Sequence, residues 1–271
     1  MIYAITGDGD DYNNFGAAFC PVGIYAYGVG QGGVNIYHNS VYLTAPNTLN
    51  HNIAYSIGIA LDNNTKANIK NNLIYNQLGR IGGNNVGATA IAAQTNASQF
   101  TSLNYNNYVT TATGGLTNSI GKIAGTDYTT LANWQTATGQ EANSLSVTPA
   151  FVSATNLHLQ TTGNDLLKAG VAVVPAITTD FDGDSRNQGL PAIGADEYKM
   201  ADIWSGNTST DWNTTSNWDN IIVPATGASV SVPFGVPNMP FLDANRTVNN
   251  LTFLRSGTPF YVNINGHTLT I

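Results

Sequence analysis

Short apolar runs recur along the first half of the chain at a nearly constant interval. Ile36, Ile69 and Leu103 follow one another at steps of 33 and 34 residues. Two further sets repeat at the same steps: Asn39, Asn72 and Asn106, and Val41, Ile74 and Tyr108. Upstream, Val22-Gly23-Ile24 and Ile57-Gly58-Ile59 align at a step of 35 residues. Each repeat therefore contains two or three strand-like runs separated by Asn and Gly.

This repeat predicts stacked turns of chain in an all-β fold. A 33-residue period also fits ankyrin units, but those require helix-forming residues. A sequence rich in Asn and β-branched residues disfavours helices. A parallel β-solenoid fits better, because identical positions would stack and apolar ladders would fill the interior. Asn suits the bends, where its amide can bond to the Asn one turn away. We therefore expect Asn39, Asn72 and Asn106 to form one file.

Two other segments depart from this repeat. Residues 131–144 predict a short helix, since Thr129 and Thr130 precede it and Gly139 can end it. Such a helix would cover the end of the stack, which otherwise offers open edges. From residue 201 onward, apolar and polar residues alternate as in β-strands, and Asn and Gly mark the turns between them. This pattern predicts a second, smaller β module. In that module, Trp204, Trp212 and Trp218 are expected to brace the fold rather than bind glycan.

Composition excludes several functional classes. Charged residues make up 9% of the 271, against a usual ~25%, while Asn contributes 35 residues. Nine Lys and Arg against 16 Asp and Glu give a net charge of −7, which disfavours nucleic-acid binding. No apolar run approaches the ~20 residues of a membrane span. The single Cys20 excludes an intrachain disulfide framework. No signal peptide opens the chain, and we expect a fragment with a truncated second module.

Several motifs, taken in order, resemble a known family. The segments are Asn71-Asn72-Leu73-Ile74-Tyr75-Asn76, Leu103-Asn104-Tyr105-Asn106-Asn107-Tyr108, residues 131–144, Pro149-Ala150-Phe151-Val152, Asp180-Phe181-Asp182-Gly183-Asp184-Ser185-Arg186 and Ile193-Gly194-Ala195-Asp196-Glu197-Tyr198. Together, from about Asn35 to Tyr198, they resemble the C-terminal part of secreted bacterial right-handed parallel β-helix proteins of the Bacteroidetes type. From residue 203, the Trp-rich sequence resembles a tryptophan-rich opening segment that is found in large secreted repeat proteins.

The resemblance implies a fold, a setting and a domain division. Residues 1–198 are expected to form the C-terminal coils and cap of a right-handed parallel β-helix, and 199–271 the β module, with a junction near Lys199-Met200. It implies a secreted protein or one at the bacterial cell surface. It does not imply one activity, because the fold hosts lyases, hydrolases and adhesins. The chain departs from the enzyme families by lacking an obvious cluster of catalytic carboxylates.

The acidic motifs are the candidates for metal binding. Asp180, Asp182 and Asp184 alternate around Gly183 and could supply oxygen ligands, so calcium is the one candidate cofactor. The alternative is that they pair with Arg186 and cap turns. The run Asp8-Gly9-Asp10-Asp11 could be a second calcium loop or a glycosidase carboxylate pair, but an exposed turn is the simpler interpretation.

The lyase hypothesis requires a base and a cation that neutralises a uronate carboxylate. The candidates are Asp62, Lys66, Lys70 and Arg80, with solvated surface charges as the alternative. The four histidines, His38, His51, His158 and His267, have no zinc-ligand spacing. No nucleophile elbow, phosphate loop or dinucleotide fingerprint occurs in the chain.

Aromatic residues in the coils are the candidates for glycan binding. The tyrosines chosen as sugar platforms are Tyr25, Tyr37, Tyr75 and Tyr105. Core packing is the alternative for most of them. The sequence thus predicts a non-catalytic, adhesin-like segment of a secreted or cell-surface protein whose partner is a polysaccharide or cell-surface glycan. The alternative is a fragment of a polysaccharide lyase or glycoside hydrolase.

Overall fold

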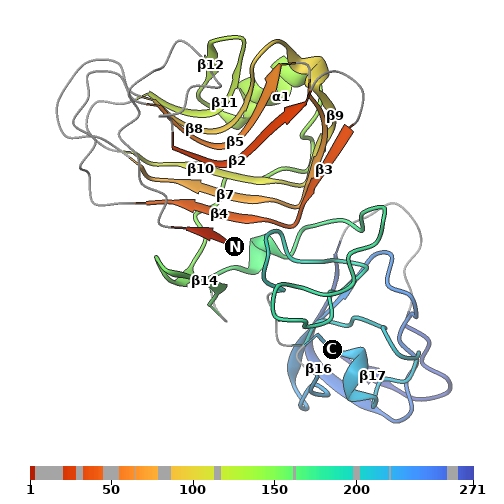
Figure 1. Cartoon of the computed structure of the whole chain (residues 1–271). Coiled ribbons are helices and arrows are strands. Elements are labelled where there is room, and N and C mark those ends of the chain that lie inside the picture. The colour runs from red at the N-terminus through yellow and green to blue at the C-terminus, as the bar shows by residue number, and fades with distance from the viewer. Residues whose placement is uncertain are drawn as a thin grey trace. The chain divides into compact units, whose positions relative to one another are not determined.

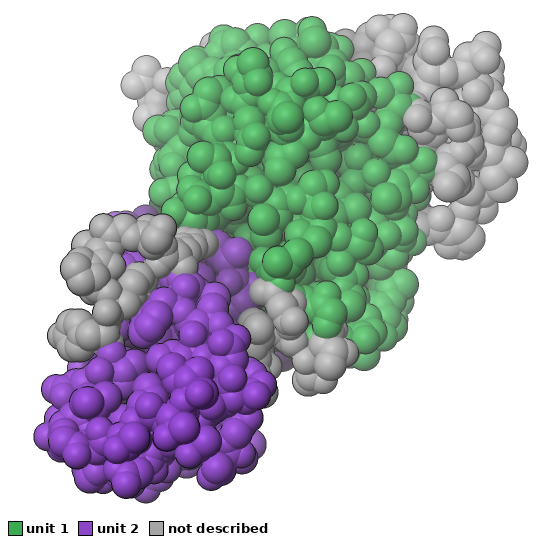
Figure 2. Space-filling model, turned by 180° about the vertical axis from the view of Figure 1, so that it is seen from behind, with its two compact units in different colours: residues 1–167, 193–196 green, residues 168–192, 197–271 purple. Residues whose placement is uncertain are grey.

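The computed structural model describes residues 1–3, 21–28, 33–44, 55–63, 65–78, 87–112, 117–160, 163–197, 202–219, 221–254 and 262–271. These residues are mostly β, as the sequence predicts. The chain divides into two compact units (Figure 2). Unit 1 contains residues 1–167 and 193–196, and unit 2 contains residues 168–192 and 197–271. The predicted junction at Lys199-Met200 lies outside the described residues, and the units differ from the predicted division by placing 168–192 with the second module.

Unit 1 contains three sheets of parallel strands (Figure 1). The first sheet consists of β2 (Val22–Gly28), β5 (Tyr55–Asn63), β8 (Gly87–Ala93) and β11 (Thr117–Ile123). The second consists of β3 (Gly33–Tyr37), β6 (Lys66–Lys70) and β9 (Phe100–Asn104). The third consists of β1 (Ile2–Tyr3), β4 (Ser40–Leu43), β7 (Leu73–Asn76) and β10 (Asn107–Thr110). The short β12 (Thr126–Tyr128) pairs antiparallel with β11.

Each passage of the chain contributes one strand to each sheet, and we call such a triplet a rung. The rungs are β2-β3-β4, β5-β6-β7 and β8-β9-β10. The strand register confirms the predicted repeat: Ile36 pairs with Ile69, and Ile69 pairs with Leu103. The set containing Val41, Ile74 and Tyr108 pairs in the same way. These side chains are buried in one continuous apolar core.

The predicted file of asparagines is present. Asn39 Nδ2 donates to Asn72 Oδ1 at 3.0 Å, and Asn72 Nδ2 donates to Asn106 Oδ1 at 3.1 Å. The same oxygens accept the backbone N–H of Asn39 and of Asn72, each at 3.0 Å. The backbone N–H of Asn106 donates to Ser144 Oγ at 2.9 Å. Asn72 and Asn106 are fully buried, so each amide satisfies polar groups that water cannot reach.

A close approach between sheets explains one of the repeated glycines. A Cβ on Gly58 would lie 2.3 Å from Ile74 Cγ2 and 2.5 Å from the backbone oxygen of Ala90. No side chain fits there without moving the backbone of the neighbouring rung. A Cβ on the aligned Gly23 would likewise lie too close to the Val41 side chain and to the backbone oxygen of Gly58.

The predicted helix is α1 (Leu131–Thr138), and it packs on the last rung. Thr130 caps its first turn by accepting from the Asn133 N–H, and Gly139 ends it at a φ of +66°. Trp134 is fully buried and contacts Phe100 edge-on, with ring centres 5.5 Å apart. Figure 1 shows α1 beside β11, so the helix covers apolar surface that a further rung would otherwise bury.

A buried carboxylate completes this cap. Glu141 is fully buried and accepts hydrogen bonds from the Tyr108 hydroxyl at 2.6 Å, from Trp134 Nε1 at 3.3 Å and from the Ser144 hydroxyl. Burial raises the pKa of Glu141, although its hydrogen-bond donors oppose that shift. No motif in the sequence marks this residue as a buried carboxylate.

Glu141 is expected to make unit 1 less stable as the pH rises from the ordinary glutamate pKa upward. In that range the native state binds more protons than the unfolded state, so the free energy of unfolding falls with pH. Replacing Glu141 with Gln should remove this contribution, which urea titrations over a series of pH values measure. In the control, Asp243→Asn, the effect should be small and opposite: burial is the largest single influence and raises the pKa of Asp243, but the hydrogen bonds to that carboxylate and the positive charge of Arg246 together lower it. Stability curves of wild type and E141Q that run parallel would contradict the assignment.

Short elements connect the main sheets. β13 (Phe151–Ser153) and β14 (Asn156–Leu159) form an antiparallel pair. The described residues also form 3₁₀ turns at Ala97–Gln99, Asp165–Leu167 and Thr215–Asn217. Among the residues described above, no helix combines the length and the apolarity that a membrane crossing needs.

Unit 2 is also built from parallel strands. β15 (Ala228–Pro233), β16 (Arg246–Leu254) and β17 (Leu269–Thr270) form its sheet. The three tryptophans pack together in its core, with Trp212 and Trp218 ring centres 4.8 Å apart. Each of the three is at most 1% exposed, which confirms the prediction that they brace the module. Trp218 Nε1 donates to the Trp212 carbonyl at 2.8 Å.

Candidate functional site

The four predicted glycan tyrosines do not form one surface. Tyr25 lies on β2, Tyr37 on β3 and Tyr75 on β7, which belong to three different sheets. Tyr75 is 9% exposed and stacks on Tyr42, with ring centres 4.9 Å apart. Tyr105 follows β9, is half-buried and has a φ of +59°. Tyr75 therefore packs inside the fold, which agrees with core packing, the alternative to glycan binding.

Tyr25 is the most exposed of the four, and it belongs to a small polar group. It is 44% exposed and stacks with Tyr27 at a ring distance of 6.4 Å. Its hydroxyl donates to Asp62 on the adjacent β5. Partial burial, together with the hydrogen bond to Asp62 and the charge of that carboxylate, raises the pKa of Tyr25 to about 12. The phenol is therefore protonated at neutral pH and serves as a hydrogen-bond donor.

The acidic run at 180–184 forms a turn. Asp180 Oδ1 accepts the backbone N–H of Asp182 at 2.9 Å and of Asp184 at 2.8 Å, while Oδ2 accepts that of Glu197 at 2.9 Å. Within the described residues, the three carboxylates do not come together within 4.8 Å. The structure thus assigns Asp180 to holding the turn, and calcium binding remains a prediction.

Two of the remaining candidates, Lys66 and His38, bond to neighbouring groups of the fold. Lys66 Nζ donates to the carbonyl of Ser98 at 2.6 Å on the surface. His38 is buried and lies 2.8 Å from the Asn71 amide, as a structural histidine does. Other candidates lie outside the described residues: Asp8, Asp10, Asp11, Cys20, His51 and Arg80.

Unit 2 contains a buried ion cluster that the sequence does not predict. Lys168 Nζ lies 2.5 Å from Glu197 Oε1 and 2.9 Å from Asp219 Oδ2. Arg186 Nη1 donates to Glu197 Oε2 at 3.2 Å, and Asn187 Nδ2 donates to Asp219 Oδ1 at 3.3 Å. All five residues are at most 9% exposed. Arg186 and Glu197 belong to the recognised closing motif, but Lys168 and Asp219 lie far from it in sequence and carried no signal.

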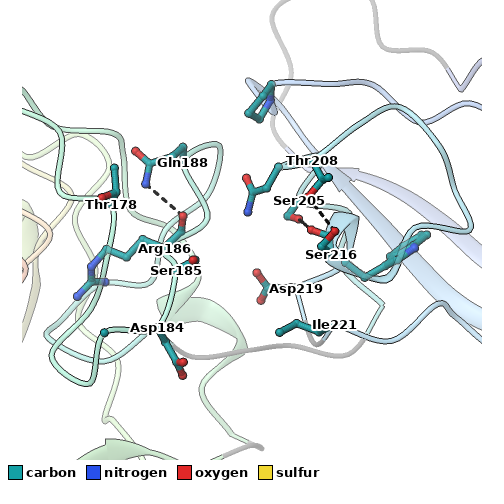
Figure 3. A pocket seen from close by; sticks show the side chains of 14 residues that line it. Thr178, Asp184, Ser185, Arg186, Gln188, Ser205, Thr208, Ser216, Asp219 and Ile221 are labelled. Atoms are coloured by element: carbon teal, nitrogen blue, oxygen red, sulfur yellow. Dashed lines mark hydrogen bonds between the residues drawn. The ribbon is translucent and has the colours of Figure 1, made fainter.

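Beside this cluster is a polar cleft of about 520 Å³ within unit 2 (Figure 3). Thr178, Ser185 and Gln188 lie on one wall. The opposite wall presents Ser205 and Thr208, and Asn207 also lines the cleft. The volume falls within the roughly 300–1,000 Å³ of small-molecule sites. Seven of the fourteen lining residues carry a hydroxyl or an amide, and apolar groups make up the rest of the lining together with a few charged ones.

The charges of the cleft are arranged for structure rather than for proton transfer. Its two lining carboxylates are Asp184, which is exposed, and Asp219, which is paired with Lys168. The guanidinium of Arg186 points away from the cleft in Figure 3 and bonds to Glu197. A general acid–base pair needs two groups that reach one reacting bond, and this arrangement does not offer them. The cleft can instead form many neutral hydrogen bonds.

No signal in the sequence could have revealed the cleft. Ser, Thr and Asn occur throughout the chain, so the lining residues do not stand out by type. Comparisons with known proteins add no further information: no protein-family model, no curated protein and no solved structure matches this chain.

Proposed function

We propose that the chain is a non-catalytic segment of a large secreted or cell-surface protein, adhesin-like in role, that contacts glycans. In this proposal unit 1 is part of a right-handed parallel β-helix that serves as a stiff support, and unit 2 is the smaller module that follows. The regular rungs support the first part, since each rung repeats the strand order of the one before. The family resemblance of the motifs supports the extracellular setting.

The proposal is supported mainly by the partners of the buried charged groups, which bond to other residues of the fold. In the described part of the chain, Glu141 accepts from the cap residues around it, and Glu197 binds Lys168 and Arg186. Each of these groups is buried and satisfied within the fold. Enzymes of the lyase or hydrolase type instead direct such groups at a substrate.

The enzyme alternative would place its chemistry on the sheet that contains β2, β5, β8 and β11. Tyr25 bonds to Asp62 there, and Lys122 on β11 lies 3.1 Å from Asp127. The register pairs Tyr25 with Ala60, Ala60 with Ala92 and Ala92 with Lys122. Asp62 on β5 is two strands away from Lys122 on β11, a separation of about 10 Å between the two strands. Asp62 bonds to Tyr25 and Lys122 pairs with Asp127, so each group already has a partner within the fold.

The proposal predicts binding without turnover. Incubation with polygalacturonate and alginate should release neither unsaturated uronates, read by ultraviolet absorbance, nor reducing ends, while a glycan array should detect bound chain. Product formation that disappears in both Asp62→Asn and Lys122→Met would overturn the proposal and favour a lyase. A known lyase run beside the chain confirms that the assay detects products.

A further inference from the structure

We infer that the polar cleft of unit 2 is a binding site for an uncharged saccharide of one or two rings. This inference rests on the proposed function, because it assigns the glycan contact to a site and names the ligand class. It differs from the sequence prediction, which assigned that contact to tyrosines of unit 1.

The lining matches the groups of a sugar. A pyranose presents hydroxyls that both donate and accept, and side-chain hydroxyls and amides can do the same. Ser185 and Asn207 both line the cleft and are exposed. Apolar contact comes from Pro237 and from Ile221, which is 57% exposed. Trp218 also lines the cleft but is 1% exposed, so the site does not depend on an aromatic platform.

The charges favour a neutral ligand over an acidic one. Glu197 and Asp219 neutralise the two buried cations, Lys168 and Arg186. Asp184 then adds a carboxylate at the lining, with Asp180 behind it in the same turn. A uronate carboxylate brought into this cleft would meet negative charge without an available cation. A sugar hydroxyl, in contrast, could donate to Asp184.

Both walls are held in place by their own hydrogen bonds. On one side, Asp180 fixes the turn, and the Arg186 N–H donates to the Thr178 carbonyl at 2.8 Å. On the other, Asn217 Oδ1 accepts from the N–H of Thr208 at 3.0 Å and from that of Ser209 at 2.8 Å. Asn187 links the walls by bonding to Asp219. A preformed cleft loses less entropy on binding, which suits weakly bound ligands such as sugars.

The test follows backbone and side-chain amides of the ¹⁵N-labelled chain by NMR during titration. The neutral probes are cellohexaose and mannohexaose, and the acidic probe is trigalacturonate at the same millimolar concentrations. We expect a neutral probe to shift Ser185, Asn207 and Thr208. Asn207→Ala should weaken that binding about fivefold, the loss expected for one hydrogen bond. Ser185→Tyr should block the cleft, and Asn250→Ala, an exposed amide on β16, is the matched control.

Three outcomes would overturn the inference. The first is that neither neutral probe shifts the cleft residues of the folded chain. The second is that trigalacturonate binds in the cleft at least as tightly as the neutral probes. The third is that N250A weakens binding of the neutral probe as much as N207A does. Shifts confined to Tyr25 and Tyr27 would overturn the cleft assignment but leave the proposed function intact. Turnover of a polysaccharide would overturn the proposed function whether or not the cleft binds.

Discussion

Replacing Asn72 with alanine is expected to lower the free energy of unfolding of unit 1 by about 3–5 kcal/mol, because several buried polar groups lose their partner together. The Asn72 amide donates to the Ile36 carbonyl at 2.8 Å as well as to Asn106, and it accepts from Asn39. Water cannot replace these bonds, since Asn72 is fully buried. Urea titration followed by circular dichroism measures the loss, and amide hydrogen exchange assigns it to unit 1.

The matched control is an asparagine pair on the surface of the same rungs. Asn68 Nδ2 donates to Asn35 Oδ1 at 2.9 Å in an exposed setting. Asn68→Ala should cost at most about 1 kcal/mol, because water can satisfy the groups left behind. Equal losses for the two variants would contradict the structural role assigned to the buried file.

Replacing Glu197 with alanine is expected to destabilise unit 2 by about 3–5 kcal/mol, the usual cost of breaking a buried ion pair from one side. Arg186 would lose its carboxylate partner, and Lys168 would keep only Asp219. The backbone N–H of Ala192, which donates to Glu197 at 3.0 Å, would also lose its acceptor. Tryptophan fluorescence during urea unfolding reports this loss, since three of the four tryptophans lie in unit 2.

A surface ion pair in the same unit provides the comparison. Asp243 lies 2.5 Å from Arg246, and both side chains are partly exposed. Asp243→Ala should change stability by about 1 kcal/mol or less, as exposed pairs do. If E197A lost no more than D243A, the cluster would not be what holds residues 168–192 in unit 2.

The stacked part of the fold could be predicted because its signal repeats. The pairing of Ile36 with Ile69 follows directly from a 33-residue step, since stacked turns bring equal positions together. The asparagine file follows from the same step. Helix α1 could be placed from its capping residues, Thr130 and Gly139, which act locally.

Contacts that depend on neither a repeat nor a local capping signal could not be predicted. The partner of Glu141 is Tyr108, 33 residues away, but no repeat of this contact marks it in the sequence. Lys168 and Asp219 meet only through folding, and neither belongs to a recognisable motif. The cleft depends on the positions of loops, which residue type alone does not determine. Residue type alone predicts the tyrosines as sugar platforms, but the sheet on which each one lies depends on its place within the rung.

The central claim is that successive turns of chain stack through the asparagine file. A ¹⁵N-edited NOESY spectrum of the whole chain tests it most directly. The structure predicts cross-peaks between the side-chain amide protons of Asn39 and Asn72, and between those of Asn72 and Asn106, which are neighbours in space although 33 and 34 residues apart. A well-dispersed spectrum of the folded chain that lacks both cross-peaks would contradict the stacked arrangement.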